Sequence, residues 1–335
     1  MGQRVEFIDL AKGICISLVV LLHVYGDLSG TAIQIMNLFR MPLYFVLSGL
    51  FFKPYDGLLS FLKKKTNKLL VPFFFIFFFI IVPSTLLLNI KNGIEPTFEN
   101  LFWGGEGKCS LGIDGAAWFL ICLYAINFCF YLIYIVTKTN LTGIIMLSLL
   151  CGAAGYTLNY YDIYLPLWFD SALTAVPFFL MGYALRSKSD FLYRQISTAD
   201  WFICVFAFMT LLGIHQFNEW QHTGTISYGS NTYDIGMCSL YIGGAAGTCL
   251  ILIVSKYIKR LPLISYIGRY SIVVLLTHLL YLFIIRNILY QMEIPQENIP
   301  LNIIVFIFLI LIEVPTIKFC IKYLPYFFAQ KDLWK

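Results

Sequence analysis

The stretch IDLAKGICISLVVLLHVYGD, residues 8–27, decides the fold class. It is mostly apolar and contains the apolar run Gly13 to Leu22, and one helix that crosses a bilayer needs about 20 predominantly apolar residues. The whole chain shares this character, because 59% of its 335 residues are hydrophobic and only 12% are charged. A soluble domain has about 25% charged residues. We therefore predict an all-α, polytopic membrane protein, and the composition excludes disordered, collagen-like and coiled-coil chains.

Similar apolar stretches follow along the chain, separated by short polar gaps. We predict a bundle of about ten transmembrane helices that forms a single domain over residues 1–335, because no repeat, low-complexity segment or polar domain interrupts them. No small-residue cleavage site follows the first apolar run, so the first span is expected to stay attached. The spans lie at roughly 8–27, 32–52, 69–90, 115–137, 141–158, 166–185, 200–217, 236–255, 263–285 and 301–321.

Basic residues are distributed unevenly between the two sides of this bundle. With the N-terminus inside, the inner gaps and the C-terminal end carry 18 of the 23 Lys and Arg residues, and the outer gaps carry 3. Such a bias favours the cytoplasm for the basic side. We expect both termini in the cytoplasm and a multi-pass protein of the inner membrane. The net charge of +5 then faces anionic membrane lipids, and nucleic acid is not expected as a partner.

The nine cysteines do not form a recognisable framework. Eight lie in apolar runs, where Cys behaves as a small apolar residue, and only Cys109 lies in a polar gap. No CxxC pair and no Cys/His cluster with zinc spacing is present. We predict neither a disulfide nor a metal site.

Ionisable side chains inside a bilayer are costly, and they are therefore candidates for function. The predicted spans contain His23, Asp27, Arg40, Asp170, Arg269, His278 and Glu313. The sequence contains no nucleophile elbow, no phosphate-binding glycine loop and no HExxH zinc motif. Any chemistry must come from these intramembrane groups.

The first span places a basic residue and a histidine on one stripe. Lys12 and His23 are eleven residues apart, which puts them within about 20° of one helix face and about 16 Å apart along it. Asp27 follows His23 by four residues and could orient its imidazole. This pattern is typical of a general base. The alternative is a structural histidine bonded to a neighbouring carbonyl.

The second span reads FRMPLYFVLSG over residues 39–49, and it carries a polar stripe of Arg40, Tyr44 and Ser48. These groups could bind an anion or steady an oxyanion. The alternative for Arg40 is a buried ion pair with Asp27 or Glu313. Because proline restricts the residue before it, we expect Pro42 to break the helix just below Arg40.

The ninth span, read as one helix, puts Ser271 and His278 on one face and Arg269 on the other, near the cytoplasmic edge. There Arg269 could meet a phosphate or extend to the interface. The lysines of the 63–68 run either meet phosphates or only fix the topology. Glu313 is expected to face the bundle interior. Trp118 and Asp170 are either site residues or part of the interfacial belt.

Five stretches together resemble the membrane acyltransferase-3 family, especially its short, single-domain branch related to fucose 4-O-acetylases. The family's first-span signature, a basic residue and a histidine separated by ten residues, is met by Lys12 and His23, with Lys where the family usually has Arg. The resemblance covers the whole chain. The stretches are RVEFIDLAKGICISLVVLLHVYG (4–26), FRMPLYFVLSGLF (39–51), KLLVPFFF (68–75), AAWFL (116–120) and YIGRYSIVVLLTHLL (266–280).

The resemblance implies an O-acyltransferase that uses cytoplasmic acetyl-CoA, or another acyl-CoA, as co-substrate without a metal. The acceptor would be a hydroxyl of a cell-envelope or exopolysaccharide sugar, which could be linked to a lipid. In this interpretation Lys12, Arg40 and Arg269 contact the CoA. His23, held by Asp27, removes the hydroxyl proton, and Arg40, Tyr44 and Ser48 steady the oxyanion. His278, Glu313, Trp118 and Asp170 are further candidates.

Two other classes of function stay open from the sequence. An exporter of a surface polysaccharide or an acylated lipid could line its path with the same His, Arg and Glu residues. The absence of a recognisable internal repeat argues mildly against a transporter. A structural subunit of an envelope-polymer synthase is the third possibility.

Overall fold

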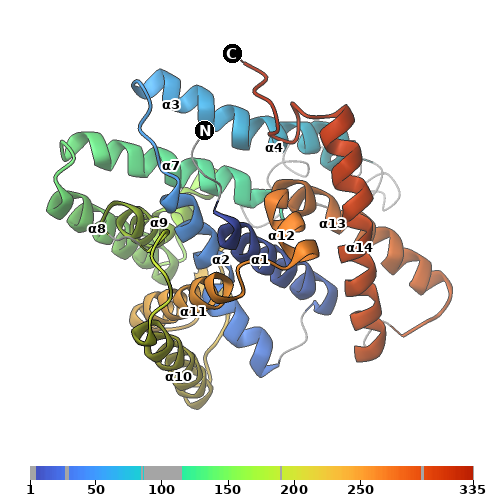
Figure 1. The fold of residues 1–335 in the computed structure, drawn as a ribbon. Coiled ribbons are helices and arrows are strands. Elements are labelled where there is room, and N and C mark those ends of the chain that lie inside the picture. The colour runs from blue at the N-terminus through green and yellow to red at the C-terminus, as the bar shows by residue number, and fades with distance from the viewer. Residues whose placement is uncertain are drawn as a thin grey trace.

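The computed structural model describes residues 5–26, 30–83, 86, 115–188, 191–295 and 298–334. Within them the chain is a helical bundle, and the predicted all-α class is confirmed (Figure 1). The described strands are a two-residue antiparallel pair, β1 (Ile226–Ser227) and β2 (Thr232–Tyr233), in the predicted gap between the seventh and eighth spans. Asp27, Cys109 and the predicted gap at 91–114 lie outside the described residues.

Nine of the described helices are long and apolar enough to cross a membrane, when η3 and α9 are taken together. The third predicted span, 69–90, falls on one continuous helical stretch that contains two π-helical turns and is described as far as residue 83. The elements are α1 (Glu6–Tyr25), α2 (Thr31–Leu50), α3 (Leu58–Lys65), η1 (Thr66–Leu70), α4 (Val71–Ile76), η2 (Phe77–Ile81), α7 (Trp118–Val136), α8 (Leu141–Tyr160), η3 (Pro166–Trp168), α9 (Phe169–Lys188), α10 (Thr198–Trp220), α11 (Met237–Ile258), α12 (Pro262–Arg269), α13 (Ser271–Gln291) and α14 (Ile299–Tyr323).

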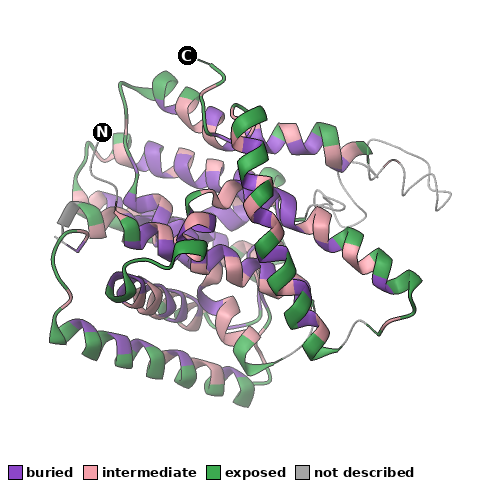
Figure 2. Cartoon of the chain, turned by 45° about the vertical axis from the view of Figure 1, so that its right-hand side comes forward, coloured by how far each residue is buried: buried purple, intermediate pink, exposed green. Residues whose placement is uncertain are grey.

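The helices differ in how much of their apolar surface the protein itself covers. In α2, 61% of the residues in the most apolar 18-residue stretch are buried inside the protein, whereas in α8 and α10 only 22% are. Figure 2 shows the same division, with buried residues gathered inside and exposed residues along outer helix faces. A spanning helix that leaves apolar side chains uncovered is solvated by lipid. We therefore place α1 and α2 at the centre and α8 and α10 at the lipid boundary.

Two glycines let α2 and α9 approach closely. A Cβ atom on Gly49 of α2 would overlap the backbone oxygen of Phe179, and one on Gly182 of α9 would overlap that of Val46. Small residues at such crossings are how membrane helices gain packing contacts without a hydrophobic driving force between them. This crossing fixes α2, which carries Arg40, Tyr44 and Ser48.

The expectation of one helix over 263–285 is wrong. Helix α12 ends at Arg269 and α13 begins at Ser271, because Tyr270 between them has non-helical dihedrals of φ −116° and ψ 31°. Helix α12 packs along α1, where a Cβ on Gly268 would overlap the α1 backbone, and α13 turns away toward α14. Because packing produces this bend, no proline or polar run marks its position in the sequence. The prediction that Arg269 and His278 lie on opposite faces of one helix is therefore wrong, because they belong to α12 and α13.

The expected break at Pro42 is also wrong, because α2 runs through this residue from Thr31 to Leu50. Pro42 is buried, and a Cβ on Gly244 of α11 would touch its ring. Membrane helices tolerate an internal proline where neighbouring helices compensate for the lost backbone hydrogen bond. The close glycine contact holds the ring in place without breaking the helix.

Candidate active site

Two histidines from different helices meet inside the bundle. His23 lies near the end of α1, and His278 lies on α13 with a fully buried side chain. Nε2 of His278 is 3.1 Å from Nδ1 of His23, and the ring centroids are 5.1 Å apart. On its other side, Nδ1 of His278 is 2.7 Å from the carbonyl oxygen of Val274. The two imidazoles thus form a short hydrogen-bonded chain that ends on backbone.

This chain fixes which nitrogen of His23 carries a proton. A carbonyl oxygen can only accept, so Nδ1 of His278 donates to Val274. In a neutral imidazole the other nitrogen is an acceptor, so Nδ1 of His23 donates to Nε2 of His278. Nε2 of His23 is then left with its lone pair. A histidine held in one tautomer by its neighbour is arranged to take a proton at the free nitrogen.

A small chamber of about 60 Å³ contains four of the predicted residues. His23 comes from α1, Arg40 and Tyr44 come from α2, and Trp118 begins α7. The side-chain atoms Nε and Nη1 of Arg40 are buried, and neither has a hydrogen-bond partner in the described chain. Buried donors without a partner are costly. The chamber thus holds a cation with free N–H groups close to the histidine that can accept a proton.

A larger cavity of about 450 Å³ continues from this chamber along the bundle. Tyr44, Phe119 and Leu275 line both spaces, so the two are adjoining. Among the described residues, no carboxylate lines the larger cavity. Its polar groups come from α1, α2, the loop that follows α2, the α3–η1 stretch, α7 and α13. They are Lys12, Ser48, Tyr55, Lys64, Lys65, Lys68, Asn127 and Ser271.

The lysines of this cavity differ in their surroundings. Lys65 precedes the third predicted span, and burial lowers its pKa from 10.5 to about 8. Lys64 forms an ion pair with Asp332, and this hydrogen bond raises the pKa of Lys64. Lys12 lies over the Phe51 ring, with Nζ 5.0 Å from the centroid. Asp332 also lies 3.7 Å from Lys68. Four lysines still outnumber this one carboxylate, and the cavity therefore favours an anionic ligand.

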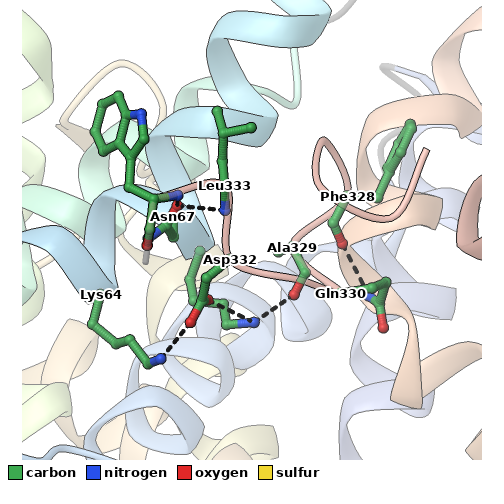
Figure 3. Close-up of polar contacts among 9 residues, drawn as sticks. Lys64, Asn67, Phe328, Ala329, Gln330, Asp332 and Leu333 are labelled. Carbon is green, nitrogen blue, oxygen red and sulfur yellow. Dashed lines mark hydrogen bonds and ion pairs between the residues drawn. The ribbon is translucent and has the colours of Figure 1, made fainter.

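The final described segment, residues 324–334, packs against the lysine side of this cavity (Figure 3). The buried Asn67 accepts from the backbone N–H groups of Leu333 and Trp334, at 2.9 and 3.0 Å. Lys68 donates to the carbonyl of Ala329 at 2.6 Å. These contacts join η1 to a segment more than 250 residues away in the sequence.

Three other predicted residues lie outside these two spaces. Arg269 lines a separate cavity of about 160 Å³ with Glu6, Asp9 and Arg260. Glu313 is fully buried, and its two oxygens lie 2.9 and 2.8 Å from the Thr277 hydroxyl.

Asp170 is buried at the start of α9, where it accepts from the N–H of Ser171 at 2.8 Å. A carboxylate in the first turn of a helix is also favourable to the helix dipole. Its neighbour Trp168 donates from Nε1 to the carbonyl of Gly229 at 2.8 Å, which ties the β1–β2 turn to η3. Trp118, whose ring lies 6.5 Å from that of Trp168, is the aromatic residue that reaches the chamber.

The sequence did not indicate the contact between His23 and His278. Each histidine stood out as a polar group in an apolar span, but only tertiary packing brings α1 against α13. The assignment of Asp27 as the partner of His23 lies outside the described residues. Likewise, Phe119 and Leu275, which join the two spaces, carry no chemical signal in the sequence.

The comparisons with known proteins agree with this architecture. The family model for the acyltransferase domain, acyltransferase-3, matches residues 5–318. Comparison with curated proteins and with solved structures finds no match. The matched range includes both histidines, every helix described above from α1 to α13, and α14 as far as Lys318. The chain therefore belongs to the acyltransferase-3 family and is a multi-pass membrane acyltransferase.

Proposed function

We propose that this protein is an inner-membrane O-acyltransferase that moves an acetyl, or other acyl, group from acyl-CoA to a hydroxyl of a cell-envelope or exopolysaccharide sugar. The observation that carries the proposal is the histidine pair, because it leaves Nε2 of His23 as the proton acceptor in the chamber that Arg40 also lines, whose Nε and Nη1 have no partner among the described residues. General-base catalysis by a positioned histidine is suited to the attack of a hydroxyl on a thioester.

The donor would bind in the lysine-lined cavity. Its CoA phosphates would contact Lys12, Lys64, Lys65 and Lys68, because cations in a cavity without lining carboxylates attract phosphate. The pantetheine arm is long and largely uncharged, and it would follow the space past Tyr44 toward the chamber. Arg269, in a separate cavity, is a weaker candidate for a donor contact than the sequence suggested.

The chemical step would use two of the chamber groups. The acceptor oxygen attacks the thioester carbonyl carbon, and its proton passes to Nε2 of His23. The carbonyl oxygen gains negative charge, which the free N–H groups of Arg40 stabilise. The C–S bond then breaks, and the leaving sulfur takes the proton back from His23, which gives an ester and free CoA. The imidazole of His278 keeps Nδ1 of His23 in place throughout.

The experiment that tests this function follows donor and product. Purified protein in nanodiscs should consume acetyl-CoA when given envelope polysaccharide precursors, and mass spectrometry should find one added acyl group per modified sugar. Surface polysaccharide from a deletion strain should lack the mass of this acyl group. A polysaccharide that is acylated normally but not exported in the deletion strain would contradict the proposal and support an exporter.

A further inference from the structure

Another cavity, of about 590 Å³, lies at the opposite end of α1 and α2 from the lysines. We propose that it binds the acyl acceptor, and that it selects an uncharged or amine-bearing sugar over an anionic one. The volume is within the range of about 300–1,000 Å³ that is usual for small-molecule sites. The inference rests on the proposed function, because it assigns that function's second substrate to a place.

Four structural elements build this acceptor cavity. The end of α1 supplies Leu22 and Gly26, and the first turns of α2 supply Gln34 and Asn37. Glu219 comes from the end of α10, and the β1–β2 hairpin region supplies the rest of the wall, including Asp234. Because α1 and α2 run in opposite directions, the end of one and the start of the other lie together. This is the end farther from Lys12 and Ser48, which line the donor cavity.

The polar side chains of this cavity have unused hydrogen-bonding capacity. Among the described residues, neither Glu219 nor Asp234 has an ion-pair partner. The Oδ1 atom of Asn37 is buried and has no hydrogen-bond partner there. Two amides can both donate and accept, and two carboxylates accept. Sugar hydroxyls, which also do both, are the groups that such a mixture would satisfy.

The acceptor cavity and the catalytic chamber share no lining residue, but residues close in sequence on α1 and α2 line the two spaces. Asn37 lines the acceptor cavity and Arg40 lines the chamber, three residues and about 4.5 Å further along the same helix. On α1, Leu22 lines the acceptor cavity and the next residue, His23, lines the chamber. The same two helices thus carry the lining of both spaces, and we infer that a bound sugar reaches His23 between them.

The hairpin connects the same two spaces. Its Gly229 packs on the indole of Trp118, because a Cβ there would stand 3.1 Å from the ring. Ile226, in the first strand, lines the acceptor cavity and is buried. The hairpin thus touches the chamber wall with one residue and the acceptor cavity with another.

Charge distinguishes the two cavities. Among the described residues, the titratable side chains that line the acceptor cavity are Glu219, Asp234 and His222. The donor cavity is lined by four lysines, of which Lys64 and Lys68 contact the carboxylate of Asp332. Ionised carboxylates accept hydrogen bonds from hydroxyl and ammonium groups and repel other anions. The arrangement favours neutral or amine-bearing acceptors here, and it keeps the phosphates of the donor on the other side.

Saturation-transfer NMR on the protein in nanodiscs tests the inference without acyl transfer. The probes are methyl glucoside, methyl glucosaminide and methyl glucuronide at pH 7. The first two should bind more strongly than the glucuronide by about fivefold, as expected for repulsion by two exposed carboxylates. In the double variant Glu219→Gln, Asp234→Asn, binding of the glucuronide should become nearly as strong as binding of the glucoside. Asn37→Leu should weaken the binding of both.

Two controls keep the outcomes separate. Asp162→Asn changes an exposed carboxylate that does not line the cavity, and it should leave the ranking unchanged. Acetyl-CoA binding should persist in every variant, which shows that the protein is folded. Absence of glycoside binding, equal binding of all three probes, or binding unaffected by Asn37→Leu would overturn the inference. The proposed function fails on a different result, namely no acetyl-CoA consumption by the wild-type protein with envelope polysaccharide precursors.

Discussion

At the scale of single residues, His278 decides what His23 can do. Its Nδ1 is bound to the Val274 carbonyl, so its Nε2 accepts from His23. Removing that acceptor frees His23 to rotate and to adopt the other tautomer. We expect His278→Ala to lower kcat by about 10–100-fold, the usual cost of losing the partner that orients an active histidine.

The matched variant for this prediction is His278→Gln, whose side-chain oxygen can still accept from Nδ1 of His23. It should recover much of the lost kcat, and KM for acetyl-CoA should stay unchanged in both variants. The measurement is steady-state CoA release by purified protein. A rise in KM without a fall in kcat would show that His278 only supports packing.

Lys65 gives the donor site a pH dependence. Burial lowers its pKa to about 8, so its charge is lost as the pH rises from 7 to 9. Phosphate binding favours the charged form, and KM for acetyl-CoA should therefore rise above pH 8, by at most about tenfold per pH unit.

The controls for the pH prediction are two neighbouring substitutions. Lys65→Gln should have a higher KM that no longer changes between pH 7 and 9. Lys64→Gln should keep the pH dependence, because the ion pair with Asp332 raises the pKa of Lys64 and holds its charge over this range. A wild-type KM that is constant from pH 7 to 9 would remove Lys65 from the donor site.

At the scale of elements, the crossing of α2 and α9 sets the position of Arg40. A methyl group on Gly182 would overlap the backbone oxygen of Val46, and no flexible side chain is there to move aside. Gly182→Ala should therefore push the helices apart and cost about 1–3 kcal/mol of stability. Thermal unfolding in detergent measures this as a lower Tm.

The chain contains a control for this element. Gly213 lies on the exposed α10, and a Cβ there would meet nothing within 4 Å. Gly213→Ala should leave Tm unchanged or raise it, because alanine is the better helix former. An equal effect of both substitutions on Tm would mean that the crossing of α2 and α9 does not hold the bundle together.

At the scale of the whole molecule, the two cavities require opposite sides of the membrane. The basic donor cavity should open to the cytoplasm and the hairpin should face outside. A cysteine introduced at Ser60 should resist an impermeant reagent added to whole cells, and one introduced at Ser230 should react. Labelling in the reverse pattern would place donor and acceptor on the wrong sides for the proposed reaction.

Much of the architecture could be predicted from the sequence because lipid imposes long apolar helices with few charges. The stripe of Arg40, Tyr44 and Ser48 was also predictable from helical periodicity, and it does line the two adjoining spaces. The bend at Tyr270 could not be predicted, because the packing of α12 on α1 produces it. The contact of His23 with His278 could not be predicted for the same reason.

The central claim is that His23 takes the proton of the acceptor hydroxyl, and one variant tests it most directly. In purified His23→Ala, acyl transfer from acetyl-CoA should fall by about 10²–10⁴-fold, the usual cost of losing a general base. Binding of acetyl-CoA, measured on the same sample by the rise of Tm with ligand, should be retained. Full acyl transfer by well-folded His23→Ala protein would contradict the account.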